Sequence, residues 1–159
     1  MRKLLIIVVA MWALAGWTGL ARAQFFSSTG PVIAILDGEL LVGEATGHLG
    51  GWGTIKLHST SKAGFTCTGE FSTADALGDS GRLRCGDGAT LTFHFQRLSM
   101  LRGYGVGDAG GSLSFTYGLT AAESVRYLQL PLGKELIGEG HSLELAAKLP
   151  LARADAPHK

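Results

Sequence analysis

Short segments that alternate apolar and polar residues, separated by glycines, constrain this chain more than any other feature. Of its 24 glycines, 19 lie between Gly30 and Gly118. The segments among them are TIKLH (54–58), FTCTGEF (65–71), GRLRC (81–85), TLTFHFQ (90–96) and SLSFTY (112–117). A period of two with β-branched and aromatic residues predicts strands, and the glycine-rich turns predict antiparallel neighbours. We therefore expect a mainly β fold, either an antiparallel meander or a small, partly closed barrel.

The alternation predicts one apolar face and one polar face, because successive side chains of a strand point to opposite sides. The apolar face comprises Ile55, Leu57, Phe65, Cys67, Phe71, Leu83, Cys85, Leu91, Phe93, Phe95, Leu113, Phe115 and Tyr117. The other face is rich in threonine and serine, with Ser114 and Thr116 at its C-terminal end. We expect this polar face to be the surface of the sheet.

The two cysteines, Cys67 and Cys85, fit a disulfide between neighbouring strands. Residues directly opposite each other in an antiparallel pair share a face. With Cys67 opposite Cys85, Gly69 lies opposite Leu83 and Phe71 opposite Gly81, so every pair faces inward. A metal site is the alternative, but no second cysteine or histidine stands at ligand spacing. We predict a cross-strand disulfide within a hairpin whose loop spans residues 72–80.

The next hairpin is predicted to turn through three residues, 86–88. With that loop, Leu83 lies opposite Leu91 and Gly81 opposite Phe93, and all four residues face inward. A two-residue turn would instead place inward-facing residues opposite outward-facing ones. We expect Gly88 in the left-handed conformation beside a bulge. Gly81 would then make room for the rings of Phe71 and Phe93.

Other elements flank these strands. VIAIL (32–36) and ELLVGEA (39–45) predict a further hairpin around Asp37-Gly38. Thr120 and Glu123 form a capping box, which predicts one short C-terminal helix before Pro131. SLELAAKL (142–149) fits either a last strand or a helical turn. The predicted organisation is one β-rich domain over residues 24–150 with a disordered tail over 151–159.

The N-terminus resembles a secretory signal peptide. Arg2 and Lys3 precede an apolar run over 4–17, and Ala21 and Ala23 are small residues at the positions of a cleavage site. We expect cleavage after Ala23 and a periplasmic or secreted mature protein, with an uncleaved anchor as the alternative. No second apolar run predicts a membrane helix, and an oxidising compartment suits the disulfide.

Charge gives no support for a nucleic-acid role. The residues after position 23 include 11 basic and 13 acidic side chains, without a basic run. We expect no nucleic-acid partner and no cofactor. The string GVGDAG (105–110) matches a dinucleotide fingerprint, but a strand follows it instead of a helix. We interpret it as a glycine-rich strand and turn.

The stretch GDSG, residues 78–81, matches the surroundings of the nucleophilic serine in trypsin-like proteases. Such an enzyme needs a histidine and an aspartate brought together by two barrels. Only 56 residues separate the predicted cleavage site from Ser80, and His48 and His58 lack the flanking residues that mark the base. Turn chemistry explains the string more simply. The turn residues Asp37, Asp87 and Asp108 are interpreted in the same way, not as calcium ligands.

Five residues of the polar face have side chains suited to binding or acid–base chemistry: His58, Glu70, Arg82, Arg84 and His94. The two histidines with Glu70 form a candidate site for a metal or for proton transfer. Solvated side chains on a polar sheet are the simpler interpretation. We therefore predict no metal site and no catalytic residues, and keep the five as candidate binding residues.

FTCTGEF followed by GDSGRLRCGDG resembles a MORN-type hairpin. It is similar also to a group of small exported bacterial proteins, largely uncharacterised, with a Cys-x-Gly-x-Phe strand and a Gly-x-Leu-x-Cys-x-Asp-Gly strand. The resemblance covers residues 43–118. It implies an antiparallel sheet that mediates protein or lipid contacts without catalysis, and it supplies no site residues.

These observations favour a non-enzymatic domain of the periplasm or cell envelope that binds a protein or an envelope component. Two alternatives remain open. One is a small envelope hydrolase that uses Ser80, or His58, His94 and Glu70. The other is a periplasmic inhibitor of a wall-degrading enzyme, by analogy with other compact β folds.

Overall fold

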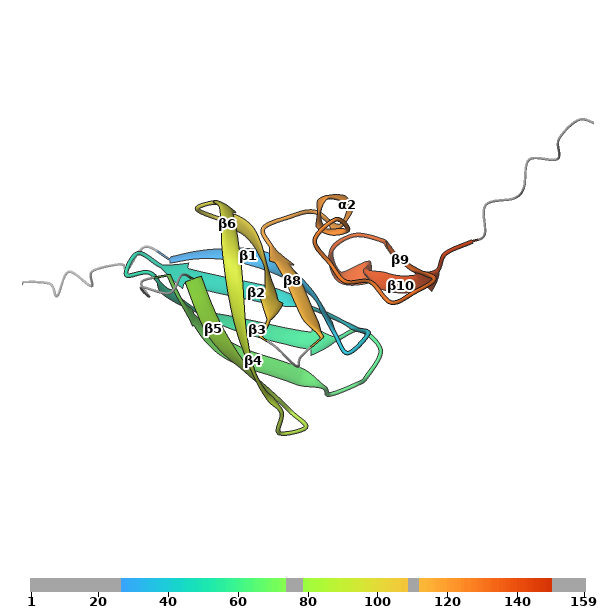
Figure 1. The fold of residues 1–159 in the computed structure, drawn as a ribbon, viewed down its shortest axis with the longest axis horizontal. Helices are drawn as coiled ribbons and strands as arrows, with labels where there is room; N and C mark the ends of the chain where they lie inside the picture. The colour runs from blue at the N-terminus through green and yellow to red at the C-terminus, as the bar shows by residue number, and fades with distance from the viewer. Residues whose placement is uncertain (1–26, 74–78, 109–111, 150–159) are drawn as a thin grey trace, which may run out of the picture.

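The computed structural model describes residues 27–73, 79–108 and 112–149. The predicted signal peptide, 1–23, and the predicted tail, 151–159, lie outside the described residues. Eight antiparallel strands close into a barrel in the order of the sequence, with β1 pairing β8 (Figure 1). They are β1 (Ser27–Leu36), β2 (Glu39–His48), β3 (Trp52–Ser59), β4 (Thr66–Ser72), β5 (Asp79–Cys85), β6 (Thr90–Ser99), β7 (Arg102–Gly107) and β8 (Leu113–Tyr117). The mainly β prediction is confirmed, and the sheet is fully closed.

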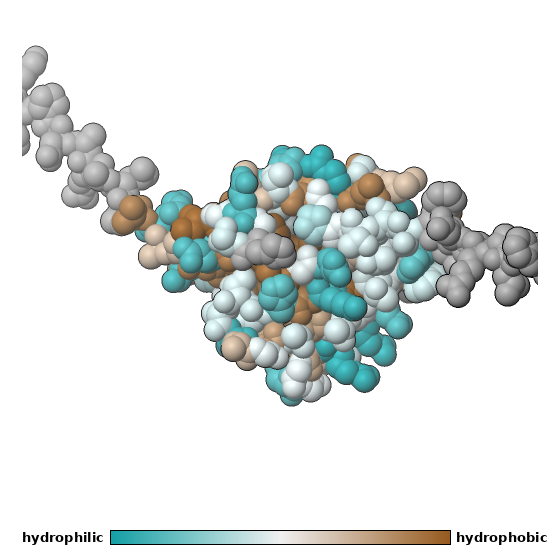
Figure 2. Space-filling view, turned by 180° about the vertical axis from the view of Figure 1, so that it is seen from behind, coloured by the Kyte–Doolittle hydropathy of each residue, from teal (hydrophilic) through white to brown (hydrophobic). Residues whose placement is uncertain are grey.

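The predicted apolar face is the interior of the barrel. All thirteen residues assigned to it belong to one core cluster or pack against it. Cys67 pairs with Cys85, and Leu83 pairs with Leu91, as the alternation of side chains requires. Figure 2 shows the outer wall from behind as mainly teal and white, with brown confined to patches.

The turns follow from residues that tolerate a positive φ. Asp37 and Gly38 have φ of 50° and 80°, which suits the two-residue hairpin between β1 and β2. Gly88 has a φ of 90° in the three-residue turn between β5 and β6. There the Cys85 amide donates to the Ala89 carbonyl at 2.9 Å, so the predicted loop is confirmed.

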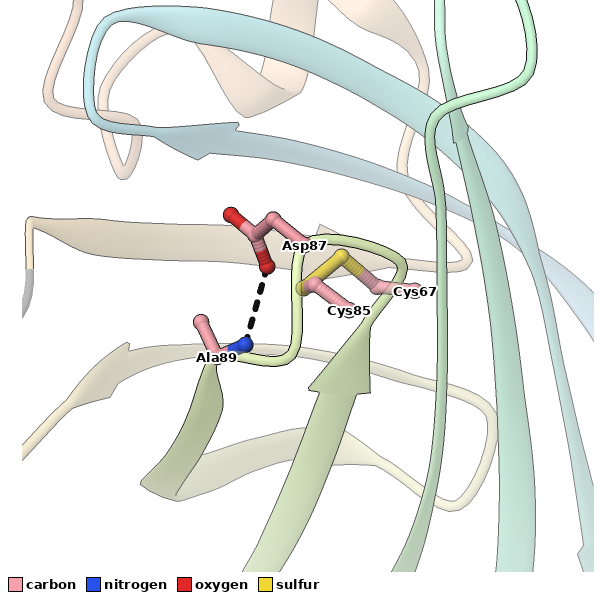
Figure 3. The surroundings of a disulfide bond; sticks show 4 residues. All are labelled: Cys67, Cys85, Asp87 and Ala89. Carbon is pink, nitrogen blue, oxygen red and sulfur yellow. Dashed lines mark hydrogen bonds between the residues drawn. A yellow bond between two sulfur atoms is a disulfide. The ribbon is translucent and has the colours of Figure 1, made fainter.

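The disulfide joins Cys67 of β4 to Cys85 of β5, with an Sγ–Sγ distance of 1.98 Å (Figure 3). It lies at the end of the barrel where the β5–β6 turn begins. In that turn the Asp87 carboxylate accepts a hydrogen bond from the Ala89 amide at 2.9 Å. Asp87 therefore stabilises the turn, as its interpretation as a turn residue predicts.

Inward aromatic rings lie over inward glycines of the neighbouring strand. A Cβ built on Gly81 would lie 2.2 Å from Cζ of Phe93. The same relation joins three further register partners: Phe71 with Gly53, Phe115 with Gly105, and Tyr117 with Gly103. Of the two rings expected at Gly81, Phe93 is therefore the one that fills the space, and Phe71 fills the equivalent space at Gly53.

The C-terminal segment packs against the outside of the barrel. It contains the helix α2 (Ala121–Ser124), β9 (Lys134–Ile137), a short 3-10 helix η1 (Gly140–Ser142) and β10 (Glu144–Ala147), which pairs with β9 (Figure 1). A second apolar cluster joins this segment to β1 and β2: Ile33, Ile35, Leu40, Val42, Leu128 and Leu143, with Leu136 and Leu145 packed against them. Residues 32–36 of β1 and 40–42 of β2 are therefore buried on both faces.

This cover corrects one prediction about the polar face. Ser114 and Thr116, expected on the surface, are 0% and 1% exposed. The Ser114 hydroxyl accepts a hydrogen bond from the Gln129 amide at 2.8 Å, and Thr116 bonds Ser124 hydroxyl to hydroxyl at 2.8 Å. Both side chains are polar because they hold the C-terminal segment, and not because they meet water.

The capping box of Thr120 and Glu123 is present and begins the predicted short helix. The helix ends at Ser124, after one turn, so the apolar residues that follow belong to a turn and not to a longer helix. Residues 144–147 form a strand, which resolves the alternative left open for 142–149. Its partner β9 was not expected from the sequence.

Candidate functional site

One end of the barrel interior is filled and the other is hollow. At the disulfide end, leucines and Phe65 occupy the inward positions. At the opposite end, the inward positions of β1 and β2 carry small residues, with Gly30 on β1 and Ala45 and Gly47 on β2. A barrel of eight strands holds either packed side chains or one small ligand. Small residues at this end therefore leave space inside the wall.

The space is a cavity of about 510 Å³ that opens at this end, which we call the mouth. Its wall is mainly apolar and aromatic, and includes Val32, Ile55, Phe71, Phe93, Phe95 and Phe115. In Figure 1 the start of β1 and the β2–β3 connection lie at the left of the barrel and the β6–β7 connection lies at its top. Cavities of this size and lining are typical of sites for small molecules.

The polar side chains that line the cavity are Ser27, Ser28, Thr29, His48, Thr73, Arg97 and Tyr117. Tyr117 lines it, and its hydroxyl is buried with no hydrogen-bond partner among the described residues. Burial raises the pKa of Tyr117 to about 12; the neighbouring Arg97 lowers it and Asp79 raises it. The hydroxyl is therefore neutral at physiological pH and available as a hydrogen-bond donor.

Arg97 also lines the cavity, and its Nε lies 2.7 Å from Oδ2 of Asp79. The Asp79 side chain is 13% exposed and the Arg97 side chain 49% exposed. The ion pair therefore places one cation and one anion beside Tyr117, and its net charge is zero.

Exposed apolar side chains gather around the mouth. Leu49 in the β2–β3 connection is 78% exposed, and Met100 in the β6–β7 connection is 84% exposed. Trp52 is half exposed and its ring lies 4.0 Å from that of His48, centroid to centroid. All four residues line the cavity opening. An apolar ligand that enters the barrel meets apolar surface before it is enclosed.

The five candidate binding residues of the polar face do not form one cluster. Glu70 and Arg82 are register partners on β4 and β5, and Arg84 faces Thr68. His58 lies on β3, opposite Val42 and Thr66, whereas His94 lies on β6, on the far side of two intervening strands. All five are exposed. The structure therefore separates the two histidines that the sequence analysis combined with Glu70.

Ser80 and His94, however, are register partners across β5 and β6. Strand β5 begins at Asp79, so Ser80 lies within the strand and not at the end of the loop. Nε2 of His94 lies 3.1 Å from Oδ1 of Asp108, and the other oxygen of that carboxylate accepts a hydrogen bond from Thr92. On the outer wall, His94 therefore lies between Ser80, its register partner, and Asp108, its ion-pair partner.

The remaining predicted motifs have structural roles. Gly105 and Gly107 of the dinucleotide-like string lie in β7, as its interpretation as a strand predicts, and Gly110 lies outside the described residues. Asp37 and Ser112 hydrogen-bond to each other through their side chains. Within the described ranges, no group of three or more histidine, cysteine or acidic side chains is placed to hold a metal ion.

None of the helices in the described part of the chain is long and apolar enough to cross a membrane. No protein-family model, curated protein or solved structure matches this chain.

The cavity was not expected from the sequence. Its signal was the presence of Gly30, Ala45 and Gly47 at inward positions, of which only Ala45 lies within the predicted hairpin segments 32–36 and 39–45. Tyr117 and Phe95 were assigned correctly to the interior, but only as core residues.

Proposed function

We propose that this protein binds a small apolar molecule in the mouth of its barrel, as a non-enzymatic binding module of the periplasm or cell envelope. The observation that carries the proposal is the cavity of about 510 Å³, lined by aromatic and aliphatic side chains and open at one end. Burying an apolar molecule there removes it from water, and each Å² of apolar surface buried contributes about 25 cal/mol.

Two further features support an envelope role. The predicted signal peptide and the disulfide both suit an oxidising compartment outside the cytoplasm. The exposed apolar residues at the mouth, Leu49, Trp52 and Met100, suit transfer of a ligand from a lipid or protein surface. The envelope component expected from the sequence would then be a small lipophilic molecule.

The test is titration of the purified protein with N-phenyl-1-naphthylamine, a neutral dye that fluoresces in apolar surroundings. We expect saturable binding of one dye per chain. Gly47→Leu adds an apolar side chain inside the mouth, where a Cβ meets only Cζ of Phe71 at 3.7 Å, and should weaken binding about tenfold or more.

The matched control is Glu44→Leu, which adds the same side chain to an exposed position of the same strand. It should leave dye affinity unchanged. Absence of saturable binding, or equal effects of the two variants, would reject the cavity as the site.

A second candidate is hydrolysis at the outer wall, favoured by the alignment of Ser80 with His94 and of His94 with Asp108. A histidine held by a carboxylate can serve as the base for a serine nucleophile. The cavity has stronger support because His94 is 57% exposed, and water competes there for every hydrogen bond.

A fluorophosphonate probe distinguishes the two candidates. If Ser80 is nucleophilic, the probe should label the wild type. Labelling should be lost in Ser80→Ala and in His94→Ala, and should be retained in the control Ser72→Ala. No labelling of the wild type would exclude this second candidate and leave the binding proposal unaffected.

A further inference from the structure

An apolar ligand alone does not explain two buried polar atoms of the cavity lining, the Tyr117 hydroxyl and Nδ1 of His48, which lack hydrogen-bond partners among the described residues. The Tyr117 hydroxyl is the deeper question, because its ring is otherwise fully used in packing. Its ring packs edge-to-face against Phe95, with centroids 6.0 Å apart, and lies over Gly103. A phenylalanine would make the same contacts. The hydroxyl is buried and has no hydrogen-bond partner among the described residues, a state that costs free energy.

The hydroxyl also has a defined polarity. It is protonated at physiological pH, as a tyrosine with its ordinary pKa of about 10 already is. Because Tyr117 lines the cavity, its hydroxyl can donate a hydrogen bond to a ligand there. The neighbouring Arg97 adds N–H donors, of which Nε is used by Asp79. Tyr117 and Arg97 thus both supply hydrogen-bond donors at this polar spot.

The charge balance of this spot restricts what it can bind. The Arg97 cation is offset by the Asp79 carboxylate, at 2.7 Å and only 13% exposed. An anionic head group would gain from Arg97 but would be repelled by Asp79, so it gains little net charge interaction. An uncharged oxygen atom can accept hydrogen bonds from these donors without this charge repulsion.

We propose that the ligand is a neutral lipophile with a carbonyl group, a ketone or an ester, whose oxygen accepts a hydrogen bond from Tyr117 while its hydrocarbon part fills the aromatic cavity. This inference rests on the proposed function and specifies the chemical class of the ligand. It assigns Tyr117 as the residue that determines specificity for the carbonyl.

Three probes of equal chain length test it: 2-dodecanone, dodecane and dodecanoate, each measured by displacement of N-phenyl-1-naphthylamine. For each probe, the affinity of the wild type is compared with that of Tyr117→Phe. Because the same probe leaves water in both measurements, differences in hydration between the probes do not enter the comparison. Tyr117→Phe should weaken the binding of 2-dodecanone by about 3- to 10-fold, which corresponds to the loss of one neutral hydrogen bond. The affinity for dodecane should be unchanged or slightly higher.

The matched control is Tyr104→Phe. Tyr104 stands on the outer wall, where its hydroxyl donates to Gln96 at 2.6 Å. The control should change the affinity of none of the three probes. Thermal unfolding of both variants establishes that each is folded during the titrations.

The outcomes separate this inference from the proposed function. If the dye itself does not bind the wild type, the proposed function is wrong and this inference fails with it. If the dye binds but 2-dodecanone does not displace it, the cavity binds apolar molecules and the carbonyl assignment alone is wrong. If dodecane and 2-dodecanone bind but Tyr117→Phe affects them equally, the cavity binds apolar molecules and the carbonyl assignment is wrong. If Tyr117→Phe weakens only dodecanoate, the ligand class is a carboxylate and the inference is overturned.

Discussion

The ring of Phe93 occupies the space that a side chain on Gly81 would need, with 2.2 Å between the position of that Cβ and Cζ of the ring. The two residues are register partners on β5 and β6. Each inward aromatic of this kind is therefore fixed to one partner in the next strand, which opposes slippage of the strands. The same rings form the floor and wall of the cavity.

Gly81→Ala should destabilise the barrel by about 1–3 kcal/mol, because the new methyl group overpacks a filled interior. Urea denaturation measures the change. In a Phe93→Ala background the cost should be smaller, since the ring is gone while the contact with the Glu70 carbonyl, 2.6 Å away, remains. The control Gly86→Ala, whose Cβ would lie 3.6 Å from its nearest neighbour, should be nearly neutral. Equal costs for the two glycines would contradict the packing argument.

Removing the disulfide should lower stability by about 3 kcal/mol in the chain-entropy picture for a loop of 18 residues. The double variant Cys67→Ala, Cys85→Ala avoids leaving a free thiol. Its melting temperature should fall by about 10 °C for a domain of this size. Dithiothreitol should lower the wild-type value towards that of the variant and have no effect on the variant itself. An unchanged melting temperature in the variant would mean that the bond contributes little.

Leu128→Ala should loosen the C-terminal segment from the barrel. Leu128 is 7% exposed in the cluster that joins this segment to β1 and β2, so its truncation should cost about 2–5 kcal/mol. Leu132, which is fully exposed, provides the control Leu132→Ala with little effect. Hydrogen exchange should show faster exchange in 134–147 for Leu128→Ala alone. Faster exchange throughout the barrel, without a preference for this segment, would indicate that the segment is not a separable cover.

Stability should depend on pH through Glu123. The Thr120 amide, then Arg102 and the Thr120 hydroxyl, donate to this carboxylate and lower its pKa from 4.5 to about 2. A carboxyl whose pKa is lower in the folded state stabilises the fold above pH 4.5, and this contribution is lost as the pH falls towards 2. Glu123→Gln should therefore show a smaller loss of urea midpoint between pH 6 and pH 3 than the wild type.

The matched control for this measurement is Glu144→Gln, at an exposed position of β10. It should keep the acid dependence of the wild type, including the part due to Glu39, whose pKa is lowered by hydrogen bonds from Ser59 and Ser61. The same dependence in Glu123→Gln as in the wild type would show that the capping carboxylate does not contribute.

Local patterns predicted a large part of this fold because local rules determine it. The alternation of side chains and the requirement that partners share a face placed Cys67 opposite Cys85 and Leu83 opposite Leu91. The capping box identified the start of α2, and the turn with Gly88 followed from the count of residues between inward positions. None of these inferences needs information from distant parts of the chain.

The remaining features depend on contacts between distant segments. Closure requires β1 to pair with β8, and no local pattern shows whether the first and last strands meet. Ser114 looks like a surface residue until Gln129 is known to bond it. The cavity depends on which end of the closed barrel receives the small residues. The alignment of Ser80 with His94 followed from the predicted register but was not drawn from it.

The pairing of Val32 with Tyr117 also has a consequence for how the chain is made. Strand β1 is synthesised first, whereas its second partner is synthesised last among the strands of the barrel. Until β8 is available, β1 and the last strand formed present open edges, which can pair with another molecule. Completion of the barrel is therefore slow relative to its local hairpins. Chains that end before Leu113 should self-associate, and any factor that holds the nascent chain apart from its copies should raise the yield of folded protein.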